Sequence, residues 1–385
     1  MDGSMSVDYS ALAAFASQTP APFQELVIRE LTDAWCEKYE NEYPQSQICC
    51  IEDNGAQYIF DRGADDEGTS PRTIAAFGSV NLDVAPRDTH YQAGFPLPES
   101  KRPIDRGHLM PHSAGGLFGP NIIPQDRALN RGWSTQGKRY RAMERRAISG
   151  PGNILFCRPI YADATDYPER IDLGFVSGSR IVVETFLNRE DAFIQRTLSG
   201  QLPGTAELTE ILDFLTVGEL GDVGEEAARA YLEDGVGATI VALGDSKMPR
   251  HQGRQDLDVL AIVDGELVAY EVKTTYSAGS AGRRTVAGNL VSPPLRRKRT
   301  RADGIESHHQ SSDAYILDRV AHVIDVDDEV LLTSRVIKVD LKGMVLQEFN
   351  VEQPGLRRRP ISPVIDCPGF VRTAITSIIA HRGWL

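Results

Sequence analysis

The chain has 385 residues and a formal net charge of −13, with 41% hydrophobic and 25% charged residues. This length predicts two to three domains, each able to bury its own core. The sequence contains no apolar run near the ~20 residues of a membrane span and no basic segment typical of a signal peptide. Five cysteines without a C-x-x-C spacing argue against structural zinc and favour free thiols in a reducing compartment.

Residues 1–43 are predicted to form a helical leader. Apolar residues recur three to four positions apart between Leu26 and Tyr39, which is the pattern of an amphipathic helix. The first hundred residues contain five basic and seventeen acidic side chains. We expect the helix to cover a neighbouring domain. The alternative is an element that docks a partner or inhibits the protein by occupying a basic groove.

Residues 44–200 are predicted to form an α+β domain, because short strands surround an Arg-rich helical segment. The first two strands flank Asn54–Gly55, a strong signal for a two-residue hairpin turn. Further strands are expected at 73–84, 153–162 and 174–187. A Gly- and Pro-containing stretch at 198–207 is the best linker, so a second domain is predicted at 207–385.

The segment 101–146 reverses the sign of the chain, since it carries ten Lys or Arg and three acids. A focused basic patch in an acidic protein is typical of a phosphate-binding surface. It contains His108 and two carboxamides, Asn121 and Asn130. An imidazole of ordinary pKa, about 6.5, suits a general base. A carboxamide oxygen can join waters around Mg²⁺. The pattern therefore predicts a site that hydrolyses phosphodiester bonds.

Three motifs in order, DRGH (105–108), NIIPQ (121–125) and LNRGW (129–133), carry a family resemblance. They resemble the DNA/RNA non-specific endonucleases of the ββα-metal, or His-Me finger, superfamily, over about residues 47–197. The resemblance implies a β-hairpin that presents His108 as general base. It also implies a following helix that presents Asn130 as the one direct ligand of Mg²⁺ or Mn²⁺, with Arg106 assisting at the phosphate.

The same resemblance assigns supporting roles. Asn121 would support the loop or lie near the metal. Glu144 is the nearest match for an acid that orders metal-bound water, although it comes several residues later than the family pattern. Arg131, like Arg106, can hold phosphate oxygens by bidentate hydrogen bonds.

Other residues of this segment have simpler expectations. We expect His112 on the surface of its loop, and Trp133 in the core rather than as a platform for base stacking. The basic residues of the following helix are expected to contact nucleic-acid backbone, the alternative being a solvated helix face: Arg139, Arg145 and Arg146.

A second site is predicted on a hairpin at 255–275. Asp264–Gly265 between two apolar runs favours a two-residue turn. In the resulting register Asp258 lies opposite Glu271, with Cβ atoms about 4.5–5.5 Å apart. Lys273, two residues further, points to the same face. Because directly opposed like charges destabilise a sheet, these carboxylates predict a bound Mg²⁺.

This D-x12-E-x-K pattern resembles the PD-(D/E)xK restriction-endonuclease-like superfamily over about residues 207–345. The resemblance implies that Asp258 and Glu271 bind the metal and that Lys273 assists the attacking water. Glu225, on a helix expected at 224–235, would complete the acidic cluster or only stabilise the helix N-terminus. Asp256 is a competing metal ligand, or a partner of Lys273.

Two segments near the second site are also assigned. The Pro-flanked basic loop at 293–304 is expected to lie on nucleic acid through its basic side chains, the alternative being a nuclear-localisation signal: Arg296, Arg297 and Lys298. Residues 308–321 are expected to form a helix behind the site, with Gln310 facing the phosphate.

The whole chain is thus expected to be α+β: a ββα-metal nuclease domain, then an α/β PD-(D/E)xK restriction-endonuclease-like domain. The expected function is a Mg²⁺- or Mn²⁺-dependent endonuclease acting on DNA, with RNA as a further substrate. We expect a bacterial antiphage-defence or toxin effector in the cytoplasm, with delivery to another cell left open. An immunity or regulatory protein is a further partner to consider, and the oligomeric state is open.

Two alternatives stay open. In the first, the PD-(D/E)xK domain grips nucleic acid without cutting, and only the His108 site hydrolyses. In the second, both sites are inactive and the chain is an interaction protein.

Overall fold

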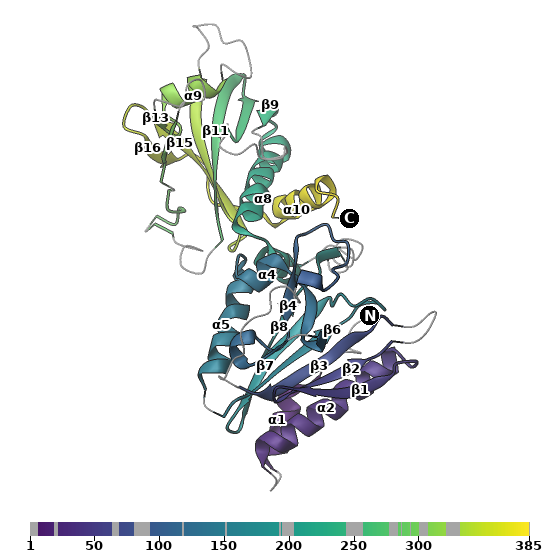
Figure 1. Cartoon of the computed structure of the whole chain (residues 1–385). Helices are drawn as coiled ribbons and strands as arrows, with labels where there is room; N and C mark the ends of the chain where they lie inside the picture. The colour runs from purple at the N-terminus through teal and green to yellow at the C-terminus, as the bar shows by residue number, and fades with distance from the viewer. Residues whose placement is uncertain are drawn as a thin grey trace. The chain divides into compact units, whose positions relative to one another are not determined.

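The computed structural model describes residues 7–18, 22–63, 69–80, 93–117, 119–150, 152–191, 194, 204–243, 257–276, 284–285, 287–292, 294–299, 307–320 and 332–384. The chain divides into two compact units, 1–199 and 200–385 (Figure 1). Asp256, most of the linker at 198–207 and the second half of the basic loop at 293–304 lie outside the described residues. None of the described helices combines the length and the apolar character that a membrane span requires.

A six-stranded antiparallel sheet, in the order β1-β2-β3-β6-β7-β8, forms the centre of the first unit. The expected first hairpin is confirmed, with Asp53 opposite Ala56. The run 174–187 is not one strand, because a turn at Gly178 divides it. The strands are β1 (Ile48–Asp53), β2 (Ala56–Asp61), β3 (Arg72–Ser79), β6 (Ile154–Ile160), β7 (Arg170–Ser177) and β8 (Arg180–Leu187).

Helices cover both faces of this sheet (Figure 1). They are α1 (Tyr9–Ser17), α2 (Phe23–Glu42) and α5 (Thr135–Ser149). Successive side chains of a strand point to opposite faces. Phe156 of β6 therefore packs with α2, whereas Leu155 and Cys157 pack with α5. Trp35 of α2 is fully buried against the sheet, so the expectation that the leader helix covers a domain is confirmed.

A second, two-stranded sheet lies apart from the six-stranded one and is followed by a short helix. Its strands pair antiparallel, with Ile104 opposite Asp126 and His108 opposite Ile122. The elements are β4 (Ile104–His108), the 3₁₀ turns η1 (His112–Ala114) and η2 (Gly119–Asn121), β5 (Ile122–Asp126) and α4 (Arg127–Arg131). A long connection thus joins the two strands of this hairpin, and the second strand leads directly into α4.

The second unit contains a sheet in the order β16-β15-β14-β11-β10-β9, with β17 paired to β15. Among these strands only β11 and β14 pair parallel. The register expected for the β10–β11 hairpin is confirmed, with Leu260 opposite Ala269. The strands are β9 (Thr239–Leu243), β10 (Val259–Val263), β11 (Glu266–Thr275), β14 (Leu332–Asp340), β15 (Val345–Glu352), β16 (Arg357–Pro360) and β17 (Ile365–Asp366).

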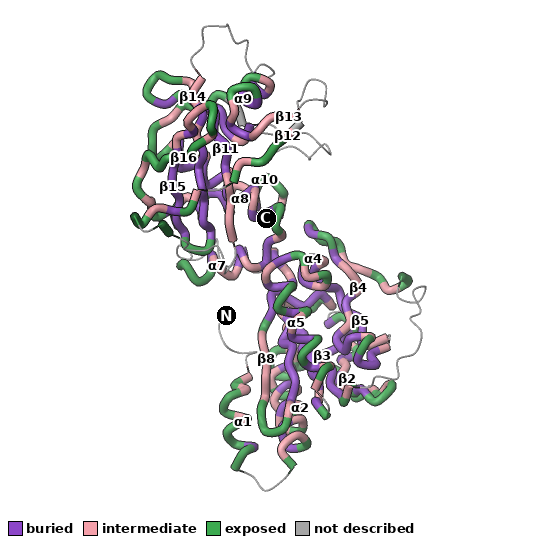
Figure 2. The backbone as a smooth tube through the Cα atoms, turned by 90° about the vertical axis from the view of Figure 1, so that its left-hand side faces the viewer, coloured by how far each residue is buried: buried purple, intermediate pink, exposed green. Residues whose placement is uncertain are grey.

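Helices cover both faces of this sheet as well. The helical elements are α7 (Thr205–Phe214), α8 (Val217–Ala230), the π-helical turn η3 (Tyr231–Val236), α9 (Asp313–Val320) and α10 (Pro368–His381). Helix α9 packs with Leu260 and Ala269 on one face. Helix α8 packs on the other face of β11, and α10 packs on α8. Figure 2 shows that the inner strands of both sheets are buried.

The helix expected at 308–321 is shorter than predicted. Residues Ser307–His309 form strand β13, which pairs antiparallel with β12 (Arg297–Arg299). Helix α9 begins only at Asp313. His308 and His309 therefore belong to a two-stranded ribbon and not to the helix, because their backbones pair with β12.

Gly224 lets α8 approach β11, since a Cβ atom there would overlap the side chain of Thr274. We expect Gly224→Ala to lower the free energy of unfolding by about 1–3 kcal/mol, as overpacking does. Gly221 in the same helix has nothing within 4 Å of its Cβ position. Gly221→Ala should therefore stabilise the protein by about 0.5–1 kcal/mol through helix propensity. Calorimetry of both variants checks this, and shifts of the same sign would contradict it.

Candidate functional site

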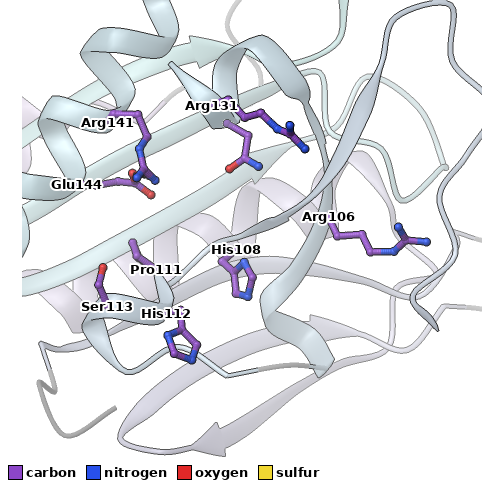
Figure 3. Close-up of a pocket in the computed structure, with 9 residues that line it drawn as sticks. Arg106, His108, Pro111, His112, Ser113, Arg131, Arg141 and Glu144 are labelled. Atoms are coloured by element: carbon purple, nitrogen blue, oxygen red, sulfur yellow. Dashed lines mark ion pairs between the residues drawn. The ribbon is translucent and has the colours of Figure 1, made fainter. Parts of the chain in front are cut away.

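A polar pocket of about 540 Å³ opens beside the β4–β5 hairpin and α4 (Figure 3). Five residues predicted from the sequence line it: Arg106, His108, Asn130, Arg131 and Glu144. The sequence reasoning assigned no role there to the other four lining residues: Pro111, His112, Ser113 and Arg141. Basic, acidic and imidazole groups from separate parts of the chain thus share one cavity.

The pairing of β4 with β5 brings the key side chains of the pocket together. His108 is the last residue of β4, and the chain returns through β5 into α4. Asp126 caps that helix, because its Oδ1 accepts a hydrogen bond from the Leu129 amide at 2.9 Å. Asn130 lies in the last turn of α4. The hairpin and the capped helix therefore hold His108 and Asn130 in one pocket although they are far apart in sequence.

Asp105 holds three side chains of α4. It accepts two hydrogen bonds from Arg131, at 2.6 and 3.0 Å, and one from Arg127 Nε at 2.9 Å. It also accepts a hydrogen bond from Asn130 Nδ2 at 3.1 Å. Burial would raise the pKa of Asp105, but these donors bring the pKa below its ordinary value. The ionised carboxylate thus fixes the Asn130 amide so that its nitrogen, and not its oxygen, faces Asp105.

Glu144 reaches the pocket from α5 despite its late position in the sequence. Its carboxylate pairs with Arg141 at 2.9 Å, and Figure 3 shows the two side chains together. Burial raises the pKa of Glu144, and the charges of Arg141 and Arg145 only partly offset this. Helix α5 can approach α4 because Gly137 has no side chain; a Cβ there would overlap the Ala128 carbonyl.

The sequence suggested that His112 lies on the surface of its loop, but the structure places it differently. It is partly buried and lines the pocket, on the same side as His108 and Ser113 in Figure 3. It does so because the 3₁₀ turn η1 folds the connection back after β4. Arg106 lines the pocket too, but it extends away from Glu144 in Figure 3. Its Nε donates to the carbonyl of Phe95 at 2.6 Å.

Asn121 has a supporting role and does not line the pocket. It is fully buried, and its Oδ1 accepts a hydrogen bond from the Met110 amide at 2.7 Å. Its Nδ2 donates to the carbonyls of Met110 and Leu117 at 3.0 and 2.8 Å. Both ends of the carboxamide thus bind backbone, which leaves the pocket to other residues and closes the loop that follows His108.

The basic residues of segment 101–146 do not all belong to an exposed positive surface. Arg102 is buried in an ion pair with Asp126, Nε to Oδ2 3.0 Å. Arg139 pairs with Glu184 of β8 at 2.6 Å. The basic residues exposed on α5 are Lys138, Arg139, Arg141, Arg145 and Arg146. The positive surface is therefore carried mainly by one side of α5.

Trp133 was expected in the core, and this expectation is wrong. Its side chain is 50% exposed, although the next residue, Ser134, is buried and caps α5. The guanidinium carbon of Arg131 lies 5.1 Å from its ring centroid.

The second predicted site centres on Glu271 of β11, which is 4% exposed. Its Oε1 forms an ion pair with Lys273 and accepts a hydrogen bond from Gln310 Nε2. Its Oε2 accepts a hydrogen bond from the Tyr315 hydroxyl at 3.4 Å. Glu271 and Lys273 share a face, as their spacing predicted. Gln310, expected to face a phosphate, contacts the carboxylate instead.

Asp258 lies directly before β10 and belongs to the same cluster. Its Oδ2 accepts a hydrogen bond from the Val272 amide at 2.6 Å. Burial, Glu271 and Glu225 together raise the pKa of Asp258 well above its ordinary value, and Lys273 opposes them. This places Glu225 of α8 within electrostatic reach of the two strand carboxylates. A divalent cation would relieve the repulsion between them.

The ribbon formed by β12 and β13 brings one basic side chain to this cluster. Burial and the charge of Lys273 lower the pKa of Lys298, against the opposing effect of Glu271. Arg296 and Arg297 are exposed. Across the described ranges, no three His, Cys, Asp or Glu side chains are placed to hold a metal ion together. A cation held by one carboxamide and waters would not need such a group.

No protein-family model matches the chain, and no match is found among curated proteins. Residues and geometry alone therefore support a functional assignment.

Proposed function

We propose that the chain is a Mg²⁺- or Mn²⁺-dependent nuclease, and that the pocket of His108 and Asn130 hydrolyses phosphodiester bonds. One observation carries the proposal. The β4–β5 hairpin and α4 bring an imidazole and a carboxamide into one polar pocket with three arginines and a buried acid. These groups supply a proton acceptor, an oxygen ligand for a hard cation and donors for phosphate oxygens.

In this proposal each side chain has a separate task. His108 takes the proton from the attacking water. The Asn130 amide is turned by Asp105, so its Oδ1 is the atom that would hold Mg²⁺. The bound ion would neutralise charge on the phosphate and the leaving oxygen. Arg106 and Arg131 bind phosphate oxygens, and Glu144 orders water near the cation. Exposed Arg139, Arg145 and Arg146 contact the backbone further along the strand.

The substrate in this proposal is DNA, with RNA as a second substrate, because the proposed contacts go to phosphates, which both nucleic acids share and which carry no sequence information. Cleavage that ignores sequence destroys nucleic acid rather than processes it. This supports a role as a bacterial antiphage-defence or toxin effector, which would need a regulatory or immunity protein to protect its host.

The second unit has two candidate roles. As a second cutting centre, Asp258 and Glu271 would bind the cation, with Glu225 completing the site and Lys273 assisting the water. As a module that binds without cutting, it would grip the backbone through Lys298, Arg296 and Arg297. The three protein donors on Glu271 favour the second role, because a metal ligand needs those oxygens.

The proposal is tested by incubating supercoiled plasmid, single-stranded DNA and RNA with the full chain. We expect cleavage with Mg²⁺ or Mn²⁺ and none with EDTA, because in this proposal the cation neutralises charge on the phosphate and the leaving oxygen. Lys273→Ala should retain cleavage if the second unit only binds. Cleavage that persists in EDTA would remove the metal mechanism, and loss of cleavage in Lys273→Ala would place the chemistry in the second unit.

A further inference from the structure

Trp133 is the one tryptophan with an exposed ring among the described residues. Its side chain is 50% exposed, whereas Trp35 is fully buried and Trp384 is 5% exposed. An indole is large and apolar, so leaving it half in water forfeits burial energy. The chain places this half-exposed ring three residues after Asn130, which lines the polar pocket. The indole thus offers an aromatic face on which a planar ligand can stack.

The indole is held in place rather than loosely tethered. Gly132 ends α4 in the left-handed conformation, φ +73°, and the Trp133 amide then donates to the Ala128 carbonyl at 2.9 Å. The guanidinium of Arg131 lies over the ring, and Asp105 fixes that guanidinium by two hydrogen bonds. One carboxylate thus orients both the Asn130 amide and, through Arg131, the indole.

The position of the ring relates it to the reacting phosphate. Trp133 is three residues from Asn130 and stacks with Arg131, and both of these line the pocket. When the phosphate of a nucleotide lies in the pocket, the base of that nucleotide lies a short distance outside the pocket. The exposed indole follows α4, and the exposed basic residues of α5 begin five residues later, at Lys138.

We propose that Trp133 is a stacking platform for an unpaired nucleobase next to the scissile phosphate, so that the site prefers single-stranded nucleic acid. The inference rests on the proposed nuclease function and specifies its substrate. Bases in a duplex are already stacked on each other, so only an unpaired or flipped base can cover the indole. Base–aromatic stacking is tolerant of sequence because every base has a π-face.

The test measures binding by cleavage-impaired protein, His108→Ala in EDTA. Its probes are a single-stranded DNA 16-mer, the same sequence as a duplex, a single-stranded RNA and a chain of abasic nucleotides. Adding Trp133→Ala should weaken binding of both single strands about tenfold, a value within the range for one stacked base. Binding of the duplex and the abasic chain should change less than twofold. Trp133→Phe should restore most of the affinity because it keeps an aromatic face.

Fluorescence gives an independent readout. Single-stranded DNA should quench the emission of the parent protein, and Trp133→Phe should abolish that quenching. Phe15→Ala removes an equally exposed aromatic ring on α1 and should change neither measurement. Equal losses for single strands, duplex and abasic chain would overturn the inference, as would no loss at all. The nuclease proposal fails separately, if the wild-type chain with Mg²⁺ cuts nothing.

Discussion

His108→Ala is expected to lower the rate of phosphodiester cleavage about 10²–10⁴-fold, the usual contribution of a positioned general base. The imidazole of His108, at the end of β4, is the group proposed to accept a proton from the attacking water. The methyl side chain of alanine cannot accept a proton, so the cation alone would have to activate the water. Single-turnover cleavage of a labelled single strand at saturating Mg²⁺ measures this step without product release.

Two comparisons make this prediction specific. His381→Ala removes an exposed histidine of α10 and should leave the rate unchanged. His112→Ala, in the same pocket, should cost less than His108→Ala because His112 lies on the connection after β4 and has no proposed role in activating the water. If His108→Ala cleaves at the wild-type rate, the first pocket is not the cutting centre.

Arg102→Met is expected to lower the free energy of unfolding of the first unit by about 3–5 kcal/mol, the cost of leaving one charge of a buried pair alone. The Arg102 and Asp126 side chains are 3% and 1% exposed. Asp126 also caps α4, so loss of its partner would loosen the helix that carries Asn130. Urea unfolding of the full chain, followed by circular dichroism, measures the change.

The matched control for this variant is its sequence neighbour. Lys101 is exposed, and Lys101→Met should change the free energy of unfolding by less than about 0.5 kcal/mol. Arg102→Met should also weaken cleavage, since α4 positions Asn130. A variant as stable as wild type would show that the Arg102–Asp126 pair contributes little to stability.

Local chemistry explains which parts of the fold were predictable. The β1–β2 and β10–β11 hairpins follow from Asn-Gly and Asp-Gly turns, whose residues adopt positive φ. A turn fixes the register of both its strands, so Leu260 was correctly placed opposite Ala269. The leader helix follows from periodicity alone. These features depend on residues close together in the sequence.

The surroundings of the first pocket were less predictable, because they depend on packing between distant segments. Nothing in the sequence indicates that Asp105 binds three side chains of α4, or that Gly137 brings α5 and Glu144 to the pocket. The exposure of Trp133 was missed for the same reason, since an aromatic residue after a helix is usually buried. The family resemblance implied roles for His108 and Asn130 but none for Asp105 or Gly137.

The carboxamide of Asn121 makes the shape of the β4–β5 connection depend on one buried side chain. It binds both the amide and the carbonyl of Met110, and thereby joins the two ends of the loop. It also donates to the carbonyl of Leu117, and Gly116 can pack against the Met110 carbonyl because it has no side chain. A change at Asn121 would therefore shift the wall of the pocket that carries His112 and Ser113, although Asn121 does not itself line the pocket.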